Sequence, residues 1–192
     1  KKRKNVKIIW FHGTSVGEIQ IIVLLFKKFE KNKKIKQILI TSNTLSSSKI
    51  IKKLRIKKIV HQFFPIDTNF FSKKFLNYWR PSSVFFIDSE IWPNMIFNLK
   101  KRNIPITLIN GRITKKTFKK WKMLPNFSKK IFKQLDLCLS SNSETKKYLE
   151  DLGVKKVKYI GNLKFSQSEN EKIIIEDNFK KFLVSKKYWC AS

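Results

Sequence analysis

Residues 6–18 read VKIIWFHGTSVGE, and this stretch decides which class of fold the chain can adopt. Its first half, residues 6–12, is a short and mostly apolar run, which is typical of a β-strand buried on both faces. Gly13 and the hydroxyl residues after it end that run. Residues 17–32 then carry apolar side chains at helical spacing. The stretch therefore predicts a buried strand, a tight loop and a helix, in that order.

The same alternation continues along the chain to residue 160. Further strands are predicted at residues 37–42, 58–64, 83–87, 105–110, 135–140 and 156–160. Further helices are predicted around residues 50–54 and at 68–79, 93–102, 114–134 (interrupted at Pro125) and 142–152. Short apolar strands that alternate with helices indicate a parallel sheet covered by helices. We therefore predict an α/β fold with a doubly wound parallel sheet.

A change in composition divides the chain at residues 167–176, its most acidic and polar stretch. We predict one domain over residues 1–166, and we interpret residues 167–192 as a hinge and the start of a truncated second domain. The first residue is Lys1 rather than Met, and the chain stops just after a strand-like apolar start. We therefore expect it to be a fragment of a longer protein.

Composition excludes several classes of protein. Hydrophobic residues make up 42% of the 192 residues, which is enough for a core and excludes a fully disordered basic tail. No apolar run approaches the roughly 18 residues that a membrane-spanning helix needs. The two cysteines, Cys138 and Cys190, are too far apart in the sequence for zinc spacing and too few for a disulfide scaffold. We therefore expect a reducing compartment.

The net charge of +30 favours anionic partners of any kind. Only five of the 43 basic residues are Arg, the residue best suited to bind a phosphate or a base edge through two hydrogen bonds. Charge alone leaves nucleic acid, an anionic membrane surface and a phosphorylated substrate as candidates. At a membrane, we expect contacts from residues 1–4 and from aromatic-basic segments such as residues 118–121.

Ligands of doubly wound sheets bind outside the carboxyl ends of the strands, so the residues after each strand are the candidates for function. After the first strand, Ser15, Gly17 and Glu18 place backbone N–H groups, a hydroxyl and a carboxylate at a helix start. The loop lacks the glycine spacing of a dinucleotide-binding loop and the Gly-Lys-Ser/Thr of a phosphate loop. A structural alternative exists, because Ser15 and Glu18 have the spacing of a helix capping box.

A second group of candidates, Asp88, Glu90 and Asn94, follows the most apolar strand. Two acids at a strand end are costly unless they are hydrogen-bonded or used. They could bind a metal ion, or orient a polar substrate or a basic side chain such as Arg112. They could also only complement the dipole of a helix that begins at Pro93. The metal interpretation is the weakest, since no His and no further acid lies nearby in the sequence.

Later strands are followed by Arg112, Asn162 and Lys164. The planar guanidinium of Arg112 suits a carboxylate or a phosphate, whereas one Lys in so basic a chain carries little information. Both histidines, His12 and His61, lie on or beside apolar strands, where we expect structural roles.

Taken together and in this order, these motifs resemble the Kdo transferases, the enzymes that add 3-deoxy-D-manno-octulosonic acid (Kdo) to the lipid A precursor. The resemblance covers nearly the whole chain. The matching stretches are residues 10–18, 65–67, 75–76 with Pro81, 88–94, 110–112 and 161–165. Each motif is weak by itself, but the joint order of SVGE, EIWPN and GNLKF is specific.

The resemblance implies a glycosyltransferase of the GT-B type, in which two Rossmann-like halves face each other across a cleft. This chain would be the N-terminal half, which binds the lipid A precursor (lipid IVA), while the other half holds most of the CMP-Kdo donor. Alone, it would be inactive. Family members work at the cytoplasmic face of the bacterial inner membrane, where an N-terminal anchor, absent here, holds them. No nucleic-acid partner is implied.

The resemblance also implies that Glu18 is the general base that takes the proton of the acceptor hydroxyl, in an inverting displacement. The candidate substrate-binding residues are Ser15, Gly17, Glu90, Asn94, Arg112, Asn162 and Lys164. Because the CMP leaving group is already a stable anion, we expect neither a metal nor a cofactor. Two alternatives remain: a basic Rossmann-like protein that binds or modifies RNA, and a non-catalytic basic adaptor at a membrane.

Overall fold

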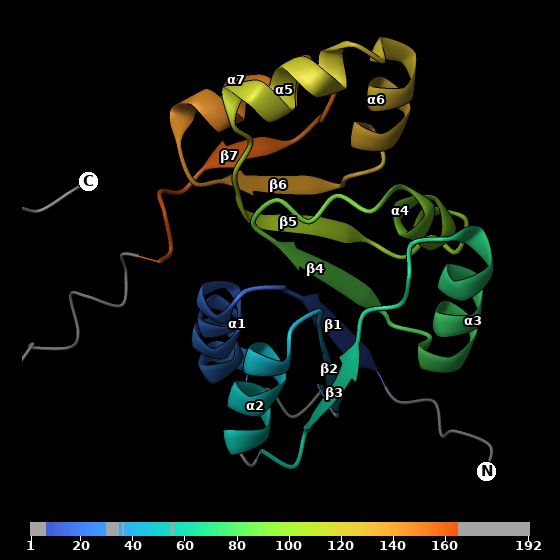
Figure 1. Ribbon diagram of the computed structural model, residues 1–192, viewed down its shortest axis with the longest axis vertical. Coiled ribbons are helices and arrows are strands. Elements are labelled where there is room, and N and C mark those ends of the chain that lie inside the picture. Colours follow the sequence, from blue (N-terminus) through green and yellow to red (C-terminus); the bar gives the residue numbers. More distant parts are fainter. Residues whose placement is uncertain (1–6, 30–34, 36, 55, 165–192) are drawn as a thin grey trace, which may run out of the picture.

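The computed structural model describes residues 7–29, 35, 37–54 and 56–164 (Figure 1). The predicted hinge and second domain at residues 167–192, and the basic residues 1–4, lie outside the described residues. Among the described residues, no helix has the length and apolar character needed to cross a bilayer.

Seven parallel strands form one sheet, in the order β3-β2-β1-β4-β5-β6-β7. Their bounds are β1 Ile8–His12, β2 Gln37–Ser42, β3 Ile59–Phe63, β4 Ser83–Ile87, β5 Ile106–Gly111, β6 Leu137–Ser140 and β7 Val157–Tyr159. The strand order reverses between β1 and β4, which are adjacent although about 70 residues separate them. This topology confirms the predicted doubly wound α/β fold, and it places the ligand-binding crevice at the carboxyl ends of β1 and β4.

The connections between strands are mostly helical. Their bounds are α1 Val16–Phe29, α2 Leu45–Lys53, α3 Asn69–Trp79, α4 Pro93–Lys100, α5 Lys115–Lys122, α6 Pro125–Phe132 and α7 Ser143–Asp151. The predicted interruption at Pro125 is confirmed, because this residue begins α6. Four other helices, α2, α3, α5 and α7, begin after a Thr or Asn whose side chain accepts a backbone N–H.

Two hydrophobic cores lie on opposite faces of the sheet. One contains Trp10, Phe86 and Leu108 of the strands together with residues of α3, α4, α6 and α7. The other contains Phe11 and residues of α1 and α2. Neighbouring residues of β1 thus enter different cores, which is why that strand is apolar without alternation. Figure 1 shows α1 and α2 together beside β1, β2 and β3, away from α3 and α4.

Candidate functional site

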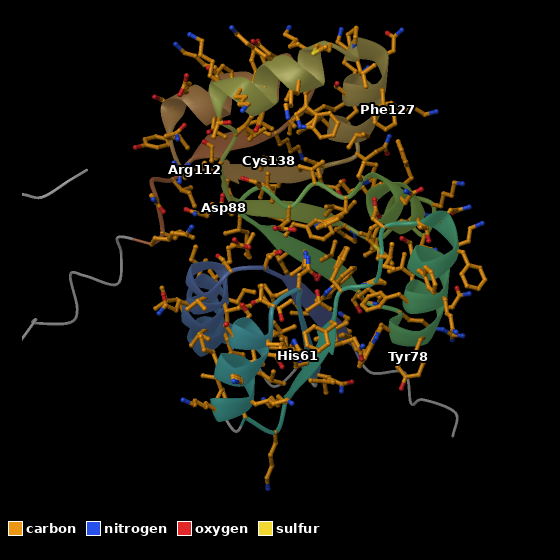
Figure 2. All side chains as sticks on the ribbon, in the orientation of Figure 1. His61, Tyr78, Asp88, Arg112, Phe127 and Cys138 are labelled. Atoms are coloured by element: carbon orange, nitrogen blue, oxygen red, sulfur yellow. The ribbon has the colours of Figure 1, made fainter. Side chains whose placement is uncertain are left out.

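The loops that sequence analysis selected meet at one edge of the sheet. They follow β1, β4, β5 and β7, and all strands are parallel, so their carboxyl ends share that edge. Figure 2 labels Asp88 and Arg112 on the side of the sheet where β4 and β5 end. Because β1 pairs directly with β4, the loop after His12 lies next to the loop after Ile87.

Glu18 lies in the first turn of α1 with only 8% of its surface exposed. Its Oε2 accepts the backbone N–H of Thr14 at 2.7 Å, and its Oε1 accepts the Ser15 hydroxyl at 2.7 Å. The Ser15 hydroxyl in turn accepts the Glu18 N–H at 3.3 Å. The predicted capping interaction therefore exists, except that the carboxylate binds the N–H of Thr14 rather than that of Ser15.

Burial raises the pKa of Glu18 above its ordinary value of 4.5. The hydrogen bonds from Ser15 and Thr14 act in the opposite direction, while the carboxylates of Glu90 and Asp88 raise this pKa further. A raised pKa makes the carboxylate a stronger base than an exposed Glu would be. The capping geometry and a catalytic role are therefore compatible in one side chain.

Glu90 has three hydrogen-bonding partners, from the end of β1, the loop after β1 and its own loop. Its Oε2 binds Nε2 of His12 at 3.0 Å and accepts Nε1–H of Trp92 at 2.6 Å. Its Oε1 accepts the Thr14 hydroxyl at 2.9 Å. Burial alone would raise the pKa of Glu90, but the hydrogen bonds and the charge interaction with His12 outweigh it and lower that pKa.

The ion pair of Glu90 is with His12, not with Arg112, so that suggested pairing was wrong. The Arg112 side chain is exposed, whereas His12 is fully buried at the end of β1 and faces the loop that follows β4. On its other side, Nδ1 of His12 lies 2.9 Å from Oγ1 of Thr41. His12 therefore has a structural role, as expected, but within the site.

Thr14 links the two acids. Its backbone N–H binds Glu18, and its side-chain hydroxyl binds Glu90. Thr14 and Trp92 are not among the site residues predicted from the sequence, although both lie inside the quoted motifs. The contact of Thr14 with Glu90 arises only because the loops after β1 and β4 are adjacent, whereas Trp92 and Glu90 lie two residues apart in one loop.

Asp88 and Lys164 form a second pair at the same edge. Nζ of Lys164 lies 2.9 Å from Oδ2 of Asp88, with the Asp88 side chain largely buried and the Lys164 side chain about one-third exposed. A Cβ atom at Gly17 would lie 3.5 Å from Cε of Lys164, so the lysine side chain passes over the start of α1. One lysine in so basic a sequence does not indicate a site, but in the fold Lys164 lies close to both the start of α1 and the loop after β4.

Backbone conformation at two strand ends supports this arrangement. Asp88 and Asn110 have φ of 65° and 55°, in the left-handed region that non-glycine residues rarely adopt. Oδ1 of Asn110 accepts the N–H of Leu163 at 2.9 Å, which brings the segment after β7 back to the end of β5. The neighbouring Asn162 accepts the N–H of Lys164 with its side chain at 3.1 Å.

Asn94 is occupied by a structural contact. Its backbone N–H and that of Met95 donate to the two carboxylate oxygens of Asp67, at 3.1 and 2.8 Å. The Asn94 side-chain amide donates to the Asp67 carbonyl at 2.7 Å. Trp92 makes no side-chain cap for α4, so Asp67 supplies that cap from another loop.

His61 and Cys138 have structural environments in the fold. His61 contacts the Ser42 hydroxyl through Nε2 at 2.9 Å, and burial raises the pKa of Cys138 to about 12.

Within the described part of the chain, no group of three His, Cys, Asp or Glu side chains could hold a metal ion. Each acid of the β4 loop instead has a basic partner, which is His12 for Glu90 and Lys164 for Asp88.

Comparison with known proteins identifies the family. The family model for 3-deoxy-D-manno-octulosonic-acid transferase (kdotransferase) matches residues 1–167. The chain belongs to the Kdo transferase family. A Kdo transferase of Rickettsia felis is 36% identical over 166 residues, which cover 86% of this chain and 35% of the relative. One from Rickettsia bellii is 34% identical over 172 residues, covering 90% of this chain and 40% of the relative.

The chain therefore spans less than half the length of the Kdo transferases that it matches. Its fold is shared more widely. The structure of UDP-N-acetylglucosamine 2-epimerase from Rickettsia bellii superposes with a TM-score of 0.60 at 17% identity, over 93% of this chain and 51% of that one. At this identity the likeness concerns the fold alone, and it supports a Rossmann-like N-terminal domain.

Proposed function

We propose that the chain is the acceptor-binding half of an inverting glycosyltransferase that moves Kdo from CMP-Kdo to the lipid A precursor, lipid IVA. Its membership of the Kdo transferase family supports the class of reaction. The observation that carries the residue assignment is Glu18, a buried carboxylate with a raised pKa at the carboxyl edge of the sheet. That is where the substrates of doubly wound enzymes bind.

In the proposed reaction, a hydroxyl of the acceptor disaccharide attacks the anomeric carbon of Kdo. The new C–O bond forms as the bond to the CMP phosphate breaks, so the anomeric centre inverts in one displacement. Glu18 accepts the hydroxyl proton, because an alcohol is a poor nucleophile at neutral pH. Its two oxygens each receive one hydrogen bond, from Thr14 and Ser15, and each oxygen has a second lone pair available.

The other site residues divide into two groups in this proposal. Arg112 is exposed beside the site, where its guanidinium can pair with a carboxylate or phosphate of a substrate. Ser15, Gly17, Asn162 and Lys164 line the same edge and can contact the sugar acids. Glu90 and Asn94 are bound to protein groups, and we assign them to positioning the loops.

We place this activity at the cytoplasmic face of the bacterial inner membrane, because the acceptor is a lipid and CMP-Kdo is a nucleotide sugar. The partners of the whole protein are then lipid IVA, CMP-Kdo and the anionic membrane surface, with no nucleic acid.

The division of labour between two halves can be tested by activity. The 192-residue chain alone should show no Kdo transfer from CMP-Kdo, because it matches only 35–40% of the length of these two relatives and we propose that the donor binds in the remainder. A chimera in which residues 1–167 replace the matching segment of the Rickettsia felis relative should transfer Kdo to lipid IVA. The measurement is labelled Kdo incorporated into lipid. Turnover by the chain alone, or an inactive but folded chimera, would contradict the proposal.

The reaction should need no metal ion. We expect the chimera to retain its activity in EDTA, because CMP leaves as a stable anion and the two acids of the β4 loop already have basic partners. Activity is measured with and without chelator, and again after magnesium or manganese is added back. Loss in EDTA that either ion restores would assign Asp88 and Glu90 to a metal site instead.

A further inference from the structure

The charged side chains of the α5–α6 hairpin are all positive. Residues 115–133 contain eight lysines and no acidic residue. Helix α5 has no buried residue, and its last turn contains Lys119, Lys120 and Lys122. Figure 1 shows the two helices at one end of the long axis of the molecule.

Three large apolar side chains project from the turn of this hairpin. Met123, Leu124 and Phe127 are 79%, 59% and 44% exposed. Figure 2 labels Phe127 on α6, at the end of the molecule that the hairpin occupies. Isolated exposed apolar residues are common, but three within five positions, with lysines before and after them in the sequence, point to an interaction surface.

The hairpin is held to the rest of the domain by different side chains. The Phe118 ring stacks on Tyr148 of α7 with centroids 4.1 Å apart, and Phe118 and Trp121 both pack against the larger hydrophobic core. These two aromatics pack partly against the protein, while Lys119 and Lys120 of the same segment are exposed. The exposed apolar residues lie further along, in the turn and in the first turn of α6.

We propose that the α5–α6 hairpin is a membrane-docking surface, with Met123, Leu124 and Phe127 inserted among lipids and the surrounding lysines bound to anionic headgroups. This inference deepens the proposed function, since it rests on a lipid acceptor for its setting. The chemistry fits the interfacial mode, in which an apolar edge enters the headgroup region and lysines lie along its border.

Charge and side-chain type together select lipid over the other anionic partners. Lysines bind the phosphates of nucleic acid as well, but contacts to the bases themselves rely largely on arginines and on exposed aromatic rings that stack on them. The hairpin has no Arg between residues 115 and 133, and two of its three projecting apolar residues, Met123 and Leu124, have no ring. Moving apolar side chains out of water lowers the free energy, and a lipid bilayer gives them an apolar environment. A hydrated phosphate backbone does not.

Vesicle binding by the 192-residue chain tests this surface without any catalytic step. Vesicles of phosphatidylcholine with phosphatidylglycerol are compared with pure phosphatidylcholine by co-sedimentation. The chain should bind the anionic vesicles, and the triple variant M123S/L124S/F127S should bind them at least tenfold more weakly. Circular dichroism should be unchanged, because the three side chains are exposed.

A matched pair of lysine variants separates the hairpin from the overall charge. K119Q/K120Q/K122Q should weaken binding by about fivefold per lysine, or roughly a hundredfold. K155Q/K156Q/K158Q removes the same charge from around β7 and should have a much smaller effect. Equal losses in the two variants would overturn the proposal in favour of diffuse attraction. Equal affinity for neutral vesicles, or an unchanged M123S/L124S/F127S variant, would overturn it as well.

RNA of matched total charge serves as the competing partner. Tight RNA binding that the hairpin variants abolish, with weak vesicle binding, would assign the surface to nucleic acid. Since none of these measurements uses CMP-Kdo or lipid IVA, their failure would leave the Kdo-transfer test of the chimera unaffected.

Discussion

Glu18→Gln should lower kcat of the chimera by at least about a hundredfold, within the 10²–10⁴ range that a positioned general base contributes. The Gln side chain keeps the size of Glu18 and can keep both hydrogen bonds, with its oxygen on the Thr14 N–H and its amide on the Ser15 hydroxyl. It cannot accept the proton. Acceptor KM should therefore change little, and the loss should lie in kcat.

Stability distinguishes this outcome from a purely structural role. Burial raises the pKa of Glu18, so its negative charge does not stabilise the folded state relative to the unfolded state at neutral pH. Replacing Glu18 by Gln should therefore leave Tm within a few degrees of the parent. Thr114→Ala is the comparison, since it removes the side-chain cap of α5 outside the site at a cost of about 0.5–2 kcal/mol. A Glu18→Gln variant that melts early and keeps its kcat would establish capping as the role of Glu18.

The pH profile gives an independent readout of the same residue. A base acts in its deprotonated form, so kcat/KM of the chimera should fall as the pH drops through the pKa of Glu18. Burial raises that pKa above 4.5, so the fall should begin at a higher pH than an exposed Glu would give. In the Glu18→Gln variant the residual activity should lack this acidic limb.

Glu90→Ala should be the most destabilising change at the site. It leaves Nε2 of the buried His12 and Nε1–H of Trp92 without their acceptor. Removing one member of a buried, hydrogen-bonded pair costs on the order of 3 kcal/mol. For a chain of this size that lowers Tm by about 6–12 °C. Thermal melting of the chain measures it.

Glu90→Gln is the matched control, because it removes the charge and keeps the hydrogen bonds. The amide oxygen can accept from His12 and Trp92 while the amide N–H donates to the Thr14 hydroxyl. We expect a much smaller loss of Tm than for Glu90→Ala. Since the Glu90 charge raises the pKa of Glu18, the acidic limb of the chimera should also move to lower pH. Equal melting of the two variants would exclude the hydrogen-bond network as the source of stability.

The charge of Glu90 also has a predictable dependence on pH. Its pKa is lowered in the folded state, so the stabilisation is present above the unfolded pKa and is lost as the pH falls through the folded one. The difference in Tm between the parent and Glu90→Gln should therefore be largest near neutral pH and should shrink in acid.

Much of the fold was predictable because its signals are local. The strand at residues 83–87 matches β4, and Pro93 and Pro125 mark the first residues of α4 and α6. A proline has no N–H to donate and a fixed φ, so it can begin a helix but not continue one. The rule that ligands bind at the carboxyl ends of parallel strands selected loops that lie at one edge of the sheet, because it needs only the strand ends and their parallel direction.

By itself, the sequence determined the α/β class, the loops that meet at the functional edge and the capping pair of Ser15 with Glu18, all of which depend on residues close along the chain. Tertiary structure alone decided that His12 pairs with Glu90 and Lys164 with Asp88, across 78 and 76 residues. It also decided which apolar residues of the α5–α6 hairpin are exposed. These contacts follow from the pairing of β1 with β4 and from the packing of the hairpin on α4 and α7. Local sequence preferences specify neither the strand pairing nor the packing of the hairpin. Both depend on which elements come together when the whole sheet is buried.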